Sequence, residues 1–157
     1  TNQPYYSMYN VGDYTFSPYR VAWREQSSEF QACAICSKND IICIADAKLI
    51  IVPCKSAEEA YYLSGFLNSS PVRLIIESYS IQIQISTHVL QHVYIPTFNS
   101  SRPHQQIAEI SKNIHKKALN GSDKVNELES ELDEHVAKFY GMNSRMLNTI
   151  QKALRDI

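Results

Sequence analysis

The chain has 157 residues, of which 44% are hydrophobic and 20% are charged, and its net charge is −1. This composition is typical of a globular domain with a buried core, and the near-zero charge counts against strong binding of nucleic acid by the chain alone. We find no apolar run near the roughly 18 residues of a membrane helix and no secretion signal, so we expect a cytoplasmic protein with reduced cysteines.

The first part of the chain has the pattern of a small sheet. Residues 1–10 are polar and rich in tyrosine, which indicates a linker or an arm. Short segments rich in β-branched, aromatic and apolar residues then alternate with turn-forming residues. The predicted strands are Tyr14–Phe16, Arg20–Trp23, Phe30–Cys36 and Leu49–Val52.

Two helices are predicted after these strands. Ser56 and Glu59 have the spacing of a capping box, so a helix begins there and continues to about Leu67. Pro71 suits the first turn of a second helix, which ends at about Ser78.

The segment 79–88 is the most informative part of the chain. Isoleucine alternates there with uncharged polar residues, which predicts a strand with one apolar and one polar face. The apolar face holds Ile81, Ile83 and Ile85, and the polar face holds Gln82, Gln84 and Ser86. Uncharged amides and hydroxyls suit the edges of DNA bases, where Gln can pair with adenine through two hydrogen bonds. A solvent-facing edge strand without a ligand is the structural alternative.

Shorter elements and then long helices are predicted beyond this segment. Ser86 or Thr87 can cap a short helix that ends at Gln91, and Val93–Ile95 predicts a short strand. Farther on, apolar residues recur every three or four positions, which is typical of one face of a helix. The first series is Ile107, Ile110, Ile114 and Ala118, and the second is Val125, Leu128, Leu132, Val136 and Phe139.

Glycine and polar residues divide these helical series. Gly121 separates the two series, which predicts an antiparallel helical hairpin. Gly141 ends the second helix, and Asn143 or Ser144 can cap a terminal helix. The apolar stripe predicted for the terminal helix is Met146, Ile150, Ala153 and Ile157. We therefore expect an α+β fold with a small mixed sheet and packed helices, followed by a helical hairpin and a terminal helix.

Several motifs in a fixed order carry a resemblance to a known family. They are Tyr14–Arg24, Lys48–Cys54, Glu58–Arg73, Val89–Pro96 and Glu131–Gly141, together with the segment 79–88. In this order the chain resembles the C-terminal target-recognition domain of N6-adenine DNA methyltransferases of restriction–modification systems, the TaqI-like specificity domain. It is also similar to the specificity subunits of type I systems. The resemblance extends from about Tyr9 to Gly141.

This resemblance implies that the chain is the DNA-recognition part of a larger enzyme whose catalytic domain is separate. Residues 11–100 would form the target-recognition lobe, and residues 101–157 the hairpin, a spacer, and the terminal helix. The expected partners are double-stranded DNA and the catalytic methyltransferase domain of the parent chain. S-adenosylmethionine would bind that catalytic domain, so we expect no cofactor in this chain.

Candidate DNA contacts follow from residue type and position. Arg20 and Arg24 share one side of a predicted strand, away from Val21 and Trp23, and a guanidinium can contact phosphate or guanine. Surface ion pairs with neighbouring glutamates are the alternative for both arginines. Lys38 lies in a predicted loop and is a candidate phosphate contact. The full set of candidate DNA-binding residues is Arg20, Arg24, Lys38, Gln82, Gln84, Ser86, Thr87 and His88.

The motifs of catalysis and of metal binding are weak in this sequence. The four glycines are isolated and no Pro-Pro pair occurs, so the donor-binding and adenine-holding loops of a methyltransferase are missing. Cys33 and Cys36 suggest zinc, but residues three apart on a strand face opposite sides. His88 and His92 have helical spacing without a glutamate between them to act as a base. We expect no catalysis and no metal in this chain.

The predicted hairpin has a second interpretation. Its middle is acidic, through Glu127, Glu129, Glu131, Asp133 and Glu134, which disfavours contact with phosphate and favours docking to protein. A protein-interaction or assembly module that works through the hairpin is therefore the alternative function.

Overall fold

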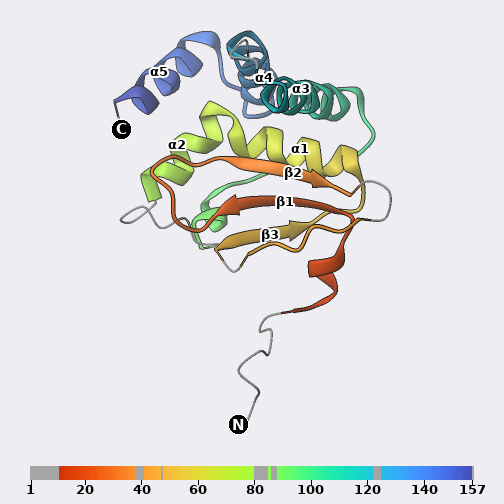
Figure 1. Ribbon diagram of the computed structural model, residues 1–157. Coiled ribbons are helices and arrows are strands. Elements are labelled where there is room, and N and C mark those ends of the chain that lie inside the picture. Colours follow the sequence, from red (N-terminus) through yellow and green to blue (C-terminus); the bar gives the residue numbers. More distant parts are fainter. Residues whose placement is uncertain are drawn as a thin grey trace.

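The computed structural model describes residues 11–37, 41–46, 48–79, 85, 88–121 and 125–156. They form an α+β fold in which a small sheet is covered on one face by two helices, and three further helices pack on these (Figure 1). The predicted fold class is confirmed. None of the described helices combines the length and the apolarity that crossing a membrane requires.

The described sheet has three strands: β1 (Tyr19–Arg24), β2 (Ala32–Cys36) and β3 (Leu49–Pro53). β1 lies in the middle and pairs antiparallel with both neighbours. The expectation of a mixed sheet is therefore wrong for the described strands. A short connection joins β1 to β2 and favours their antiparallel pairing, and β3 then pairs antiparallel with the other edge of β1.

The first predicted strand is instead a helical turn. Residues Asp13–Phe16 form the 3₁₀ helix η1, which packs beside β3. Local bonds close this turn, because Thr15 N donates to Gly12 O at 2.9 Å and Gly12 N donates to Thr15 Oγ1 at 3.3 Å. Apolar composition alone did not distinguish this turn from a strand.

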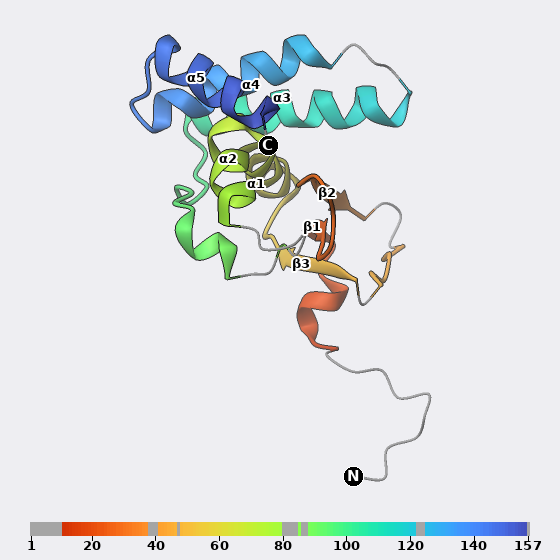
Figure 2. The same ribbon diagram turned by 90° about the vertical axis from the view of Figure 1, so that its left-hand side faces the viewer.

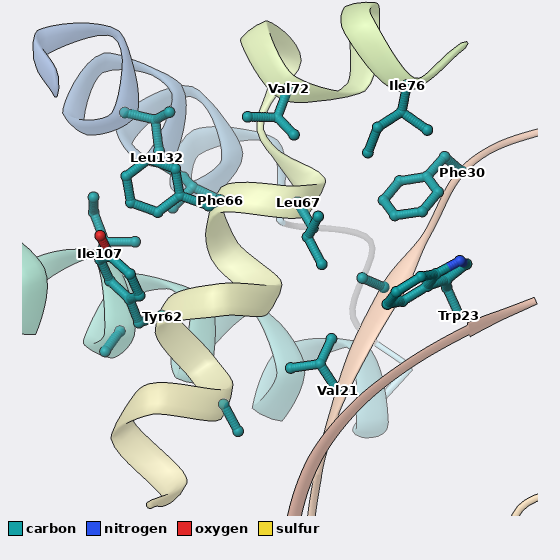
Figure 3. Packing of buried hydrophobic residues seen from close by; sticks show 14 of the residues in the cluster. Val21, Trp23, Phe30, Tyr62, Phe66, Leu67, Val72, Ile76, Ile107 and Leu132 are labelled. Carbon is teal, nitrogen blue, oxygen red and sulfur yellow. The ribbon is translucent and has the colours of Figure 1, made fainter. Parts of the chain in front are cut away.

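Helix α1 (Ala57–Asn68) and helix α2 (Ser70–Tyr79) cover the sheet. The predicted start of α1 is confirmed, since the Ser56 hydroxyl accepts a hydrogen bond from Glu59 N at 3.2 Å. The core forms where α1 and α2 meet β1, and Figure 3 shows side chains of all three elements pointing into it. Its largest buried side chains include Trp23, Tyr62, Phe66, Leu67, Val72 and Ile76.

The last three helices are α3 (Arg102–Leu119), α4 (Asn126–Phe139) and α5 (Ser144–Arg155). α3 and α4 form the predicted antiparallel hairpin (Figure 2). Gly121 and Gly141 both have a φ of 65°, the left-handed conformation that ends a helix at little cost only in glycine. Asn143 caps α5, as its side chain accepts from Met146 N at 3.0 Å.

Helix α3 approaches α1 closely at one glycine. A Cβ atom on Gly65 would lie 3.1 Å from both Ile107 Cγ2 and Ser111 Cβ. Next to it, the hydroxyls of Ser64 and Ser111 are 3.1 Å apart and share a buried hydrogen bond. The hairpin is thus fixed to α1 at its base.

Two details of the predicted elements differ in the structure. Leu147, rather than the predicted Met146, is the buried residue of the first turn of α5; Met146 is 49% exposed. Val93–Ile95 is irregular rather than a strand, and tyrosine hydroxyls satisfy carbonyls of this stretch. Tyr140 Oη donates to Tyr94 O at 2.6 Å, and Tyr62 Oη donates to Pro96 O at 2.9 Å.

Candidate nucleic-acid interface

The C-terminal end of β1 brings together parts of the chain that are far apart in sequence. Ile85 N donates to Glu25 O at 2.7 Å, and Trp23 Nε1 donates to Ile85 O at 3.4 Å. Ile85 is 3% exposed and belongs to the core, in agreement with the apolar face predicted for its segment. The segment 79–88 therefore meets the sheet at this end.

Five of the predicted contact residues cannot be placed. They are Lys38, Gln82, Gln84, Ser86 and Thr87, which lie outside the described residues. The three that the structure describes are Arg20, Arg24 and His88.

Arg24 is exposed and is the last residue of β1. It directly precedes Glu25, whose carbonyl holds Ile85, so the two candidate regions meet here. The ion pairs considered as the alternative, with Glu25 or Glu29, are not formed: the salt bridges among the described residues join Arg73 to Glu77 and Lys112 to Glu109. Among the described residues, the guanidinium of Arg24 therefore has no carboxylate partner.

Arg20 does not fit the prediction of a DNA contact. It is 0% exposed, and its Nη1 donates to Thr15 O at 3.0 Å. Alternation along β1 does put it on the same side as Arg24, but Arg20 is buried and bonded to η1 through Thr15, whereas Arg24 is exposed. Its Nε and Nη2 have no hydrogen-bond partner among the described residues.

A cleft of about 510 Å³ opens beside Arg24. It is lined by the β1–β2 connection, the junction of α1 with α2, and the facing parts of α3 and α4. Its charged lining residues are Arg24, Arg73, Glu29, Glu129 and Asp133. Since Arg73 is already bound to Glu77 at 2.8 Å, the cleft has no excess of positive charge, which argues against a phosphate site inside it.

Asp133 is part of the framework rather than of the acidic surface predicted for the hairpin. It is 6% exposed, and its carboxylate accepts from Ser70 N at 2.7 Å and from Gln151 Nε2 at 2.8 Å. It therefore caps α2 and links α2, α4 and α5. The other four acidic residues of the predicted surface are Glu127, Glu129, Glu131 and Glu134, and all are exposed.

His115 is also occupied by structural bonds. Its Nε2 accepts from Ala34 N at 3.0 Å, which places the proton of the neutral ring on Nδ1, the donor to Ser111 O at 2.8 Å. Burial lowers the pKa of this imidazole, and its bond to Ser111 offsets part of the effect. The ring holds the edge strand β2 against α3 in its neutral form.

The cysteines are spread over the sheet. Cys33 pairs with Ala22 and Cys36 with Tyr19, so they project from opposite sides of β2, as their spacing predicts. Burial raises the pKa of Cys33 and raises that of Cys54 to about 12, so both thiols are protonated at neutral pH. In the part of the chain that the structure describes, no three or more His, Cys, Asp or Glu side chains gather as a metal site would require.

His88 is exposed and precedes the 3₁₀ helix η2 (Val89–His92). Its Nδ1 lies 3.3 Å from Gln91 Nε2. The helical spacing of His88 and His92 does not bring the two rings together, because a 3₁₀ helix has about three residues per turn. His92 instead stacks on Tyr79, with ring centroids 3.9 Å apart. The sequence analysis did not predict this pair, and no local pattern in the sequence indicates it.

Comparison of the chain with models of known protein families, with curated proteins and with solved structures gave no match.

Proposed function

We propose that this chain is a non-catalytic DNA target-recognition domain of a site-specific adenine-N6 DNA methyltransferase or of a fused restriction–modification enzyme. The observation that carries the proposal is the hydrogen bond from Ile85 N to Glu25 O at 2.7 Å. It joins one residue of the segment with the alternating Ile and Gln pattern to the strand end that carries the exposed Arg24. We infer that the uncharged polar groups of this segment act together with Arg24.

The chemistry of this end suits base edges better than phosphates. Gln and Ser side chains form hydrogen bonds with bases without attracting every phosphate, and a single arginine can contact guanine or one phosphate. With a net charge of −1, the chain depends on another domain for most of its phosphate contacts. The catalytic domain of the parent chain supplies these contacts, binds S-adenosylmethionine and receives the flipped adenine.

A selection experiment with the complete chain tests the proposal. The chain is incubated at low salt with a pool of random duplexes, and the affinities for an enriched duplex and for a scrambled duplex are then compared. We expect enrichment of a sequence, and we expect Arg24→Ala to weaken binding about 5-fold to 150-fold, the equivalent of one specific contact. A larger loss on the enriched duplex indicates guanine as the target, and an equal loss on both duplexes indicates phosphate.

Arg102 provides the matched control, because it is an exposed arginine at the start of α3 and not part of this surface. Arg102→Ala should leave binding unchanged. The proposal fails if no sequence is enriched, or if the two arginine variants behave alike.

A protein-docking module is the second candidate, and the hairpin carries it. Leu119 at its tip is 87% exposed, and α4 presents the exposed carboxylates of Glu127, Glu131 and Glu134. An apolar tip beside an acidic helix suits a basic protein surface rather than DNA. This candidate predicts that Leu119→Ser removes binding to a parent catalytic domain while duplex binding stays as it was.

A further inference from the structure

Tyr79 and His92 form an exposed parallel stack. Their ring centroids are 3.9 Å apart and their planes differ by 7°. Tyr79 is the last residue of α2, and His92 is the last residue of η2. These two elements are adjacent in space and lie on the side of the molecule that faces the viewer in Figure 2, as does the end of β1. The stack therefore lies on the same side of the molecule as the end of β1 that carries Arg24.

Both rings of this stack keep exposed surface. Each ring covers one face of the other, yet Tyr79 keeps 53% of its surface exposed and His92 is exposed as well. A third flat ring can therefore continue the stack. Aromatic side chains accept nucleobases in this way, at about 1–3 kcal/mol per base, whatever the sequence.

The sequence on either side of these rings indicates the chemistry of the ring that the stack fits. Residues 78–101 contain no Asp, Glu, Lys or Arg, in a chain of which 20% is charged. The nearest acidic residue before this stretch, Glu77, is paired with Arg73 at 2.8 Å. Amides, hydroxyls and imidazoles are left, such as the Gln91–His88 pair. Such a surface does not concentrate phosphates, but it solvates the edges of an uncharged heterocycle.

We propose that the Tyr79–His92 stack is a platform that accepts an unpaired nucleobase. The inference rests on the proposed function, because a base leaves a duplex to stack on protein only when the protein is bound to that duplex. It gives the domain a second way to contact DNA, by stacking on a base that has lost its partner, beside hydrogen bonding to paired bases.

The test compares two duplexes that differ by one unpaired 2-aminopurine, whose fluorescence falls when it stacks on another ring. Affinities of the complete chain for both are measured by anisotropy, and the emission of the unpaired base is followed in the same titration. We expect the chain to prefer the duplex with the unpaired base about tenfold, and we expect Tyr79→Ala to abolish both the preference and the quenching. Tyr79→Phe keeps the ring and should retain both.

Tyr94 supplies the control, since it is 75% exposed and its backbone carbonyl, which the substitution keeps, is the acceptor for Tyr140 Oη. Tyr94→Ala should keep the preference and the quenching of the unsubstituted chain. Equal affinity of the unsubstituted chain for the two duplexes overturns the platform but leaves the proposed function intact. An unchanged preference in Tyr79→Ala does the same. If the unsubstituted chain binds neither duplex at low salt, the proposed function fails and the platform fails with it. Tyr79-dependent binding of a proline-rich peptide without any binding of DNA would instead identify a protein partner.

Discussion

Arg20 and Arg24 lie on the same side of β1, but their environments are opposite. Arg24 is exposed beside a polar cleft, whereas Arg20 is 0% exposed and makes one hydrogen bond, to Thr15 O. An isolated charge in a protein interior is costly, because removal from water is not compensated when its N–H groups have no partners. The two residues should therefore respond to substitution in different ways.

Replacement of Arg20 by methionine tests this cost. We expect Arg20→Met to be as stable as the unsubstituted protein or more stable, since the apolar methionine side chain fills the same space without a buried charge. Arg20→Ala should lose about 2–5 kcal/mol, because it leaves a cavity. Urea unfolding measures both values. A large loss in Arg20→Met would show that the guanidinium is paired with a group outside the described residues.

The imidazole of His115 gives the stability a dependence on pH. Burial lowers its pKa in the folded chain, and burial also lowers that of His104, whose Nδ1 accepts from Asn99 N at 3.2 Å. Near the ordinary value of 6.5, the unfolded chain therefore binds more protons than the folded chain. The stabilisation is complete above this pH and is lost as the pH falls towards the lower folded values.

The free energy of unfolding, measured between about pH 5.5 and 8, avoids the titration of carboxylates. We expect it to decrease below the ordinary pKa of 6.5 in the parent chain, to decrease less in His115→Gln, and to be nearly level when His104→Gln is added. An unchanged slope in the double variant contradicts this assignment.

At the scale of the elements, buried polar groups set how the helices are arranged. Asp133 on α4 accepts hydrogen bonds from Ser70 at the start of α2 and from Gln151 on α5. Asn68 at the end of α1 binds both the N–H and the carbonyl of Ala32, at 2.8 and 2.7 Å, and so fixes the start of β2. Apolar packing brings these elements together, and directional bonds then select one arrangement.

Removal of the Asp133 carboxylate should loosen the junction of three helices. We expect Asp133→Ala to destabilise the fold by about 1–3 kcal/mol, because buried donors of Ser70 and Gln151 lose their acceptor. The neighbouring Glu134 is exposed, so Glu134→Ala should change the stability by less than about 0.5 kcal/mol. Thermal unfolding followed by circular dichroism compares the two. Equal losses would mean that the bonds of Asp133 contribute nothing beyond helix charge.

At the scale of the whole molecule, the charge distribution divides the chain into two parts. Helix α1 lies between the sheet and the hairpin (Figures 1 and 2). The end of β1 carries the exposed Arg24, and α4 of the hairpin carries exposed carboxylates. With a net charge of −1, the chain does not attract phosphates strongly by itself.

This distribution predicts weak and salt-sensitive binding of DNA by the chain alone. We expect dissociation constants in the non-specific range of roughly 10⁻⁴ to 10⁻⁶ M, with a loss of affinity as the salt concentration rises from about 50 to 200 mM. Anisotropy titrations with a labelled duplex at several salt concentrations measure both. Nanomolar binding at physiological salt would contradict the expectation and would reveal a basic face outside the described residues.

The sequence by itself determined most of the local structure. Helical periodicity predicted α3 and α4, the capping residue Ser56 predicted the start of α1, and glycine predicted both helix ends in the hairpin and after it. The alternation of Ile and Gln correctly assigned Ile85 to the core. Each of these features depends on residues a few positions apart, so it can be recognised from the sequence alone.

Only the tertiary structure decided which groups face solvent and which are paired. Alternation put Arg20 and Arg24 on one side of β1, but it did not say that Arg20 is buried against Thr15 of η1 while Arg24 is exposed. Asp133 lies among the acidic residues of α4, and the sequence did not indicate that it caps α2. The spacing of His88 and His92 likewise did not indicate that His92 stacks on Tyr79. A periodic pattern gives the side of an element that turns inward, whereas the burial of the other side depends on segments that return from elsewhere in the chain.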